Sequence, residues 1–173
     1  MNAKPDTNKD KPIGGRLEKI SVNLGIGKLS ADSNFSDKAL EGVMKDFALI
    51  TGQKPQTRPA KKSIAGFKLR EGTVVGLRAT LRGARMMEFL DRLIKVVIPR
   101  IRDFRGIDKK SVDSNGNLTI GIKENYVFPE INPEVSKINF GLEITVVPES
   151  VKNREAAIKL YESLGILFKK TEK

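Results

Sequence analysis

Four separate segments of this chain alternate apolar and polar side chains, and this two-residue period constrains the fold more than any other feature. The segments are residues 16–24, 73–82, 118–123 and 140–147. Because successive side chains of a β-strand point to opposite faces, each segment predicts a strand with one buried face and one polar face. Strands of this kind belong to a sheet that is covered on one side only. The sequence therefore predicts a sheet with a free polar face.

Three further segments, residues 36–51, 85–97 and 153–164, have a helical period with a single apolar stripe each. We expect Gly52 to end the first helix in a left-handed conformation and Pro99 to stop the second. The pair Asn115-Gly116 favours a type I′ turn before the third strand. Strands and helices together predict an α+β fold, with an open, largely antiparallel sheet and helices on one face.

The segment 73–82 indicates what the polar face is for. It presents Arg78, Thr80 and Arg82 in a row, about 6.6 Å apart by the rise of a strand, which is close to the phosphate repeat of an RNA strand. Asn23 joins them if the first strand is a neighbour. The pair of aromatic residues usual on single-stranded RNA platforms is missing, which favours recognition of RNA shape and backbone.

The net charge of the chain lies entirely within residues 53–110. This third contains sixteen Lys and Arg against five Asp and Glu, which equals the whole charge of +11, and the other 115 residues sum to zero. Within 100–106 we expect Asp103 to form an ion pair with a neighbouring arginine. A charge concentrated in this way is typical of a surface that binds a polyanion. Nucleic acid is the first candidate for this polyanion, and anionic lipid is the second.

Residues 60–72 contain two glycines, several cations and Phe67, and predict a long hairpin-like loop. Two interpretations are open. The loop is either a solvated connection between strands, or a nucleic-acid contact in which Phe67 stacks on a base or ribose while the cations meet phosphates. The absence of any acid between Arg58 and Arg70 favours the second.

The composition argues against most enzymes. The chain has no Cys and no His, which removes thiolate metal sites, the usual zinc ligand and a Ser-His pair. An enzyme would have to use Glu88, Asp91 or Asp103, but Arg85 and Arg92 flank the first two, and helix-surface ion pairs explain that arrangement better. A membrane-surface protein needs a basic amphipathic helix with exposed aromatic residues, and none of the three helices has them. No cofactor or metal is expected.

The domain organisation is simple. Residues 1–16 are rich in Lys, Asp, Asn, Pro and Gly, predict a flexible N-terminal arm, and lack the apolar region of a signal peptide. Residues 17–173 predict a single α+β domain that carries the basic loop at 58–72. No apolar run approaches the roughly 18–20 residues of a membrane span.

Several strings identify a family. They are NLGIG at Asn23–Gly27, ITGQKP at Ile50–Pro55, KKSIAGFKLREG at Lys61–Gly72, ATLRG at Ala79–Gly83, PRIRDFRG at Pro99–Gly106, GN at Gly116-Asn117 and FPEI at Phe128–Ile131. In this order they resemble the large-subunit ribosomal protein five family of bacterial type, which carries 5S ribosomal RNA. The similarity covers residues 17–168, and PRIRDFRG with KSIAGFK is its most specific part.

The resemblance implies an α+β protein of the cytoplasmic ribosome, in the central protuberance of the large subunit. It implies binding of 5S rRNA by the sheet face, proximity to 23S rRNA and neighbouring large-subunit proteins, contact of the basic loop with P-site tRNA, and an intersubunit bridge to a small-subunit head protein. By position, the 5S-facing residues are Asn23, Gln53, Thr80 and Arg82, to which the strand pattern adds Arg78. The tRNA-facing loop contains Arg58, Lys61, Lys62, Ser63, Phe67, Lys68 and Arg70.

The sequence departs from this family in two places. Bacterial members usually begin with an amphipathic helix before the first strand, and residues 1–16 do not have the pattern of one. Val146–Glu149 also replaces the Thr-rich strand end that is common in relatives. Contacts made by these two parts of the family are not transferred to this chain.

Overall fold

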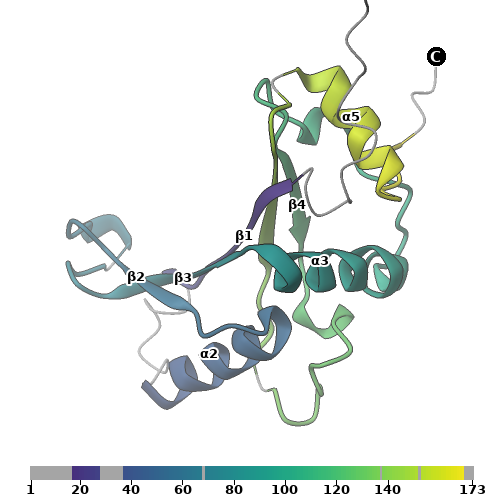
Figure 1. Ribbon diagram of the computed structural model, residues 1–173. Helices are drawn as coiled ribbons and strands as arrows, with labels where there is room; N and C mark the ends of the chain where they lie inside the picture. Colours follow the sequence, from purple (N-terminus) through teal and green to yellow (C-terminus); the bar gives the residue numbers. More distant parts are fainter. Residues whose placement is uncertain (1–16, 28–36, 68, 137, 152, 170–173) are drawn as a thin grey trace, which may run out of the picture.

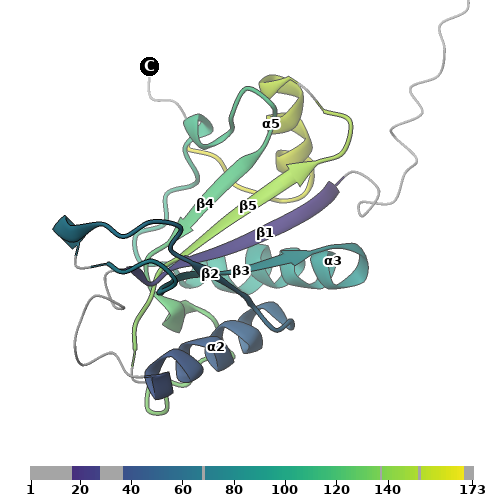
Figure 2. The same ribbon diagram turned by 90° about the vertical axis from the view of Figure 1, so that its left-hand side faces the viewer.

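The computed structural model describes residues 17–27, 37–67, 69–136, 138–151 and 153–169, so the predicted N-terminal arm lies outside the described residues. The described strands form one antiparallel sheet in the order β2-β3-β1-β5-β4. Their bounds are β1 Leu17–Gly25, β2 Gln56–Pro59, β3 Val74–Leu81, β4 Leu118–Ile122 and β5 Leu142–Pro148. All four predicted strands are confirmed, β2 is an additional short strand, and β1 lies at the centre (Figure 2).

The helices lie on one side of this twisted sheet (Figure 1). They are α2 Asp37–Thr51, α3 Gly83–Arg92, α4 Ile98–Arg100 and α5 Arg154–Ser163. Phe47, Phe89 and Tyr161 from the three predicted stripes are buried against the apolar side of the strands. Gly52 has a φ of 66°, as expected after the first helix. The predicted α+β fold with helices on one face is therefore confirmed.

The prediction that Pro99 stops the second helix is wrong. A π-helical turn, Leu93–Val97, follows α3, and Pro99 lies inside α4. A proline within a regular α-helix has no N–H to donate, and its ring meets the carbonyl four residues earlier. The π turn changes the hydrogen-bond pattern just before the proline, since Ile98 N–H donates to Leu93 O, five residues back. The helix ends only where Ile101 becomes extended.

The turn before β4 also differs from the predicted type I′. Such a turn needs a positive φ at both central residues, but only Gly116, with a φ of 85°, has one, and Asn115 does not. Gly116 N–H donates to Asp113 O at 3.2 Å, and the Asp113 carboxylate accepts from the backbone N–H groups of Asn115 and Asn117 at 2.9 and 2.7 Å. The aspartate stabilises a three-residue connection with glycine in the left-handed position instead.

The C-terminal segment packs beside the PRIRDFRG string. Ile107 N–H donates to Leu167 O, and Lys169 N–H donates to Ile107 O, both at 2.8 Å. Gly106 has a φ of 101°, and a Cβ at this position would lie 2.7 Å from the Lys169 nitrogen. The close approach of two backbones therefore explains why this string contains glycine. Among the described helices, none combines the length and apolar character needed to cross a membrane.

Candidate nucleic-acid interface

Strand register brings the polar side chains of the sheet into two continuous rows. Antiparallel pairing places Ser21 opposite Thr80 on one side and opposite Thr145 on the other. The first row is therefore made of four hydroxyl groups, on Thr80, Ser21, Thr145 and Thr119. The second row contains Gln56, Arg78, Asn23, Glu143 and Gly121. We call these two rows the polar face; they contain hydrogen-bond donors and acceptors on a rigid frame.

Arg78 is held in place on this face. Its Nε donates a hydrogen bond to Ser21 Oγ at 3.1 Å, from β3 to the neighbouring strand β1. Ser21 is only 5% exposed although it is polar, because the arginine side chain covers it. The bond uses one donor of the guanidinium and leaves the remaining donors for a ligand. Arg78 thus offers a cation whose orientation is fixed before any RNA arrives.

Four of the five predicted 5S-facing residues line the same surface depression. It has a volume of about 440 Å³, and its lining includes Gln53, Arg78, Thr80 and Arg82. Gln53 reaches this place because α2 ends at Thr51, whose hydroxyl lies 3.4 Å from Gln53 N and donates to Phe47 O at 2.9 Å. The fifth residue, Asn23, is the cross-strand partner of Arg78. The structure therefore brings all five predicted residues onto one surface.

The charge beside Arg82 is partly compensated. Lys19 Nζ lies 2.9 Å from a carboxylate oxygen of Glu18. This hydrogen bond, with the charges of Lys19 and Arg82, lowers the pKa of the Glu18 carboxyl below its ordinary value. Glu18 is exposed and stays ionised at neutral pH, so it orients Lys19 at the beginning of β1 and attracts Arg82 without contacting it in an ion pair.

Glu143 is the main residue of the polar face that the sequence analysis missed. It is exposed, pairs with Asn23 across the β1–β5 ladder, and faces Gly121, which has no side chain, on β4. Among the described residues it belongs to no ion pair. A carboxylate in this position repels phosphate groups but can accept hydrogen bonds from the amino groups of bases. The alternation of apolar and polar residues in β5 already predicts that Glu143 points outward. Its position beside Asn23 could not be predicted, because it depends on the order of the strands.

The basic loop is an ordered extension of the β2–β3 hairpin. Ala60 N–H donates to Thr73 O at 2.8 Å, and Gly72 N–H donates to Ala60 O at 3.0 Å. A bridge joins Ile64 to Leu69 around a short 3-10 turn, and Ser63 Oγ accepts from Glu71 N–H at 2.9 Å. The loop extends beyond the rest of the sheet (Figure 1).

The predicted tRNA-facing side chains lie along this extension except for Arg58, which lies in β2 opposite Gly76, two residues from Gln56 of the polar face. Those that the structure describes are all exposed: Arg58, Lys61, Lys62, Ser63, Phe67 and Arg70. Lys68 lies outside the described residues. Phe67 is 73% exposed, which is unusual for a large aromatic side chain and leaves its ring available for stacking.

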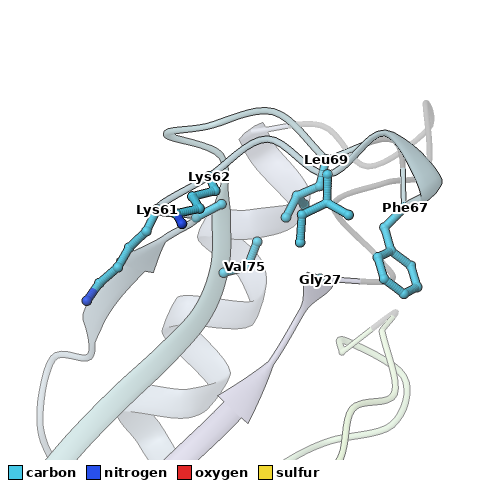
Figure 3. Close-up of a pocket in the computed structure, with 8 residues that line it drawn as sticks. Gly27, Lys61, Lys62, Phe67, Leu69 and Val75 are labelled. Atoms are coloured by element: carbon cyan, nitrogen blue, oxygen red, sulfur yellow. The ribbon is translucent and has the colours of Figure 1, made fainter.

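An apolar hollow of about 780 Å³ lies next to Phe67 (Figure 3). Its lining includes Ile64, Leu69 and Val75, and the Lys61 and Lys62 side chains lie on its other side. Aliphatic and aromatic surface next to ammonium groups suits the flat face of a base or ribose with its phosphate nearby. The loop therefore has the two kinds of exposed group, an aromatic ring and cations, on which the predicted nucleic-acid contact depends.

The carboxylates considered for catalysis do not gather in one site. Asp91 forms a helix-surface ion pair at 3.2 Å, but its partner is Lys95 in the π-helical turn after α3 and neither of the flanking arginines, Arg85 and Arg92, that the sequence suggested. Arg92 is only half exposed; it donates to Ile50 O at 2.7 Å and pairs with Glu130 at 2.9 Å, so it is a structural residue. Asp103 forms none of the ion pairs among the described residues, contrary to our expectation; it lies in a turn with a φ of 53°.

An antiparallel sheet that is covered by helices on one side and presents arginines and hydroxyl groups on the other has the architecture of a sheet-based RNA-binding protein. Comparison with known proteins agrees. Residues 15–70 match the family model of ribosomal protein L5, and residues 74–168 match that of the ribosomal L5P family C-terminus. The chain belongs to the ribosomal protein L5 family, which is structural and has no enzymatic activity.

Individual relatives give the same result. The chain is 51% identical over 153 residues to the large ribosomal subunit protein uL5 of Rubrobacter xylanophilus, an alignment that covers 88% of this chain and 82% of the relative. It is 50% identical to that of Oceanobacillus iheyensis, over 90% of this chain and 84% of the relative. It is 51% identical to that of Chlorobaculum tepidum, over 90% of this chain and 82% of the relative.

Proposed function

We propose that the chain anchors 5S rRNA in the central protuberance of the large ribosomal subunit, and that the polar face is the surface that holds it. As a member of its family it is a structural protein of the large subunit, which in bacteria lies in the cytoplasm. The residues assigned to 5S rRNA are Asn23, Gln53, Arg78, Thr80 and Arg82. The observation that carries this proposal is that four of them line one depression and the fifth pairs with Arg78.

The face suits a folded RNA better than a single strand. Arg78 and Arg82 supply cations for phosphates, and the row of hydroxyl groups supplies donors and acceptors for riboses. In the described part of the face there is no aromatic side chain on which bases could stack. Because the hydrogen bond to Ser21 fixes Arg78, the face selects an RNA whose phosphates are already correctly spaced.

We assign a second RNA, the P-site tRNA, to the basic loop. The residues proposed for it are Arg58, Lys61, Lys62, Ser63, Phe67, Lys68 and Arg70. The support is the extension of the loop away from the polar face and the exposed Phe67 next to two lysines. Contact with 23S rRNA, with neighbouring large-subunit proteins and with a small-subunit head protein through an intersubunit bridge completes the proposed set of partners.

The test is a titration of purified protein into 5S rRNA at several salt concentrations, with an RNA of equal length as control. We expect tight binding that prefers 5S rRNA and weakens steeply with salt, because several phosphates release counterions. Equal and weak binding to both RNAs would contradict the proposal and would mean that the polar face attracts RNA only through its general positive charge. Deleting residues 61–70 should leave 5S affinity nearly intact and weaken only the contact with tRNA.

A further inference from the structure

The cations of the PRIRDFRG string take no part in the functions assigned above, and the fold gathers two of them at the far edge of the sheet. Arg100 is the last residue of α4, Arg102 follows it, and Lys123 follows β4; all three are exposed. They line a hollow of about 550 Å³ whose lining also includes Gly121, Ile122 and Val127. None of the three cations is in an ion pair with a described residue. This cluster, which we call the β4-edge hollow, lies at the opposite end of the strand order from the β2–β3 hairpin.

The outer edge of β4 is incompletely paired where the hollow lies. Within the described chain, β4 pairs with β5 on one side, and on the other only Val112 bridges to Leu118 at its beginning. Its second half, towards Ile122, is the part that meets the hollow. Figure 2 shows β4 at the margin of the sheet, with β5 beside it. An unpaired strand edge presents backbone N–H and C=O groups that another extended chain can use.

The residues that line the hollow indicate the chemistry of an extended chain that could pair with this edge. The hollow is lined by three cations and by one carboxylate, that of Glu124, so its rim attracts negative charge. Ile101 and Val127, both half-buried, add apolar surface between the charges. Nucleic acid could use the cations and the apolar surface, which includes Tyr126, but it would leave the strand edge unused. An extended peptide with alternating acidic and apolar residues would use all three features.

We propose that the β4-edge hollow is a docking site for an extended acidic segment of a neighbouring protein, which pairs with β4 as an additional strand. The segment would extend the order β2-β3-β1-β5-β4 by one strand, and its carboxylates would meet Arg100, Arg102 and Lys123. This site goes beyond the proposed RNA contacts. It would let the protein hold RNA with its polar face and bind a protein at the opposite edge at the same time.

The experiment uses the full chain and a synthetic probe, an acetylated and amidated peptide with four Glu-Val repeats. Binding is measured by fluorescence anisotropy, and amide hydrogen exchange is followed with and without the peptide. We expect slower exchange at residues 120–123 on binding. The variant Arg100→Ala/Arg102→Ala/Lys123→Ala should weaken binding about tenfold, since charge pairs at a rim steer and hold an oppositely charged ligand. A matched variant, Lys38→Ala/Lys45→Ala/Lys159→Ala, removes the same charge from exposed helix positions and should bind as the unaltered chain does.

Equal weakening by both triple variants would mean general attraction between opposite charges and would overturn the proposal. Peptide binding without protection of residues 120–123 would overturn strand pairing. Binding of a short RNA duplex that depends on the same three cations, in place of the peptide, would make the hollow a nucleic-acid site. The hollow borders the polar face at Gly121, but the first variant changes none of the five residues assigned to 5S rRNA. A 5S rRNA titration therefore separates this proposal from the previous one, because 5S affinity should fall no more with the first variant than with the matched variant.

Discussion

The polar face and the basic loop both carry cations, but they hold them in different ways. On the polar face, the hydrogen bond to Ser21 fixes Arg78 within a ladder of paired strands. On the loop, Lys61 and Lys62 are exposed, and the order of the segment comes from backbone bonds and from Ser63. Groups with a fixed orientation distinguish one RNA shape from another. Exposed, mobile side chains attract any RNA through their charge, whatever the positions of its phosphates. The comparison predicts that specificity belongs to the face and salt-dependent attraction to the loop.

The largest effect should come from the face. We expect Asn23→Ala/Thr80→Ala/Arg82→Ala to lower 5S rRNA affinity by at least about 100-fold, because two hydrogen bonds and one phosphate contact are lost together. Affinity for tRNA should stay the same. The measurement is a pair of titrations at one salt concentration, with thermal unfolding to confirm that the variant folds. A loss shared equally by both RNAs would contradict the division between face and loop.

The carboxylate of Glu143 provides a second test of whether specificity for 5S rRNA belongs to the polar face. We expect Glu143→Ala to lower 5S affinity by roughly 5- to 100-fold, because an acceptor that pairs with base donors contributes about 1–3 kcal/mol of discrimination. The loss should be confined to 5S rRNA and absent for the control RNA. If Glu143 only repels phosphate, the substitution will raise the affinity for both RNAs, and the assignment to base recognition fails.

A smaller effect is expected from the loop cations. Lys61→Ala/Lys62→Ala should weaken tRNA binding by roughly tenfold and lower the slope of log affinity against log salt by about two, one unit for each phosphate contact. The 5S titration should be unchanged. Lys38→Ala/Lys45→Ala on α2 serves as the control for charge alone. An unchanged slope would remove both lysines from the contact surface.

The smallest effect concerns the order of the loop itself. Ser63→Ala removes the acceptor of the Glu71 N–H, and because the bond is exposed we expect a loss of only about 0.5–1 kcal/mol in local stability. Hydrogen exchange at Glu71 should become faster, and tRNA affinity should fall by roughly two- to fivefold, because the hydroxyl is also one of the groups assigned to tRNA and a single hydrogen bond is lost. Unchanged tRNA affinity would mean that the serine only orders the loop, and would remove it from the residues assigned to tRNA.

The sequence predicted most of the fold because one physical rule decides each element. Alternation in 73–82 and 118–123 follows from burial of one strand face, and the stripes of the helices follow from the same cause. The errors arose where a side chain or a helix defect changed the local geometry. The carboxylate of Asp113 replaced the type I′ turn with another connection, and a π turn carried the helix past Pro99.

The candidate site was predictable only in part. Individual strands gave the outward direction of Arg78 and Thr80, and the family resemblance added Gln53. The neighbours Glu143, Thr145 and Thr119 could not be placed on the same face, because strand order depends on contacts between residues far apart in the chain. The β4-edge hollow was missed for the same reason, since Arg100 and Lys123 meet only in the folded sheet.

The central position of β1 has a consequence for how the protein is made. Ile20 pairs with Val146, more than 120 residues later in the chain, and the ladder between β1 and β5 cannot form before β5 has left the exit tunnel. Pairings of such long sequence separation are slow to form. During synthesis, the hairpin of β2 and β3 is complete early, while the polar face stays unfinished until nearly the whole chain exists. A partly synthesised chain therefore presents its cations without the surface that selects among RNAs, and the timing of assembly depends on the last strand.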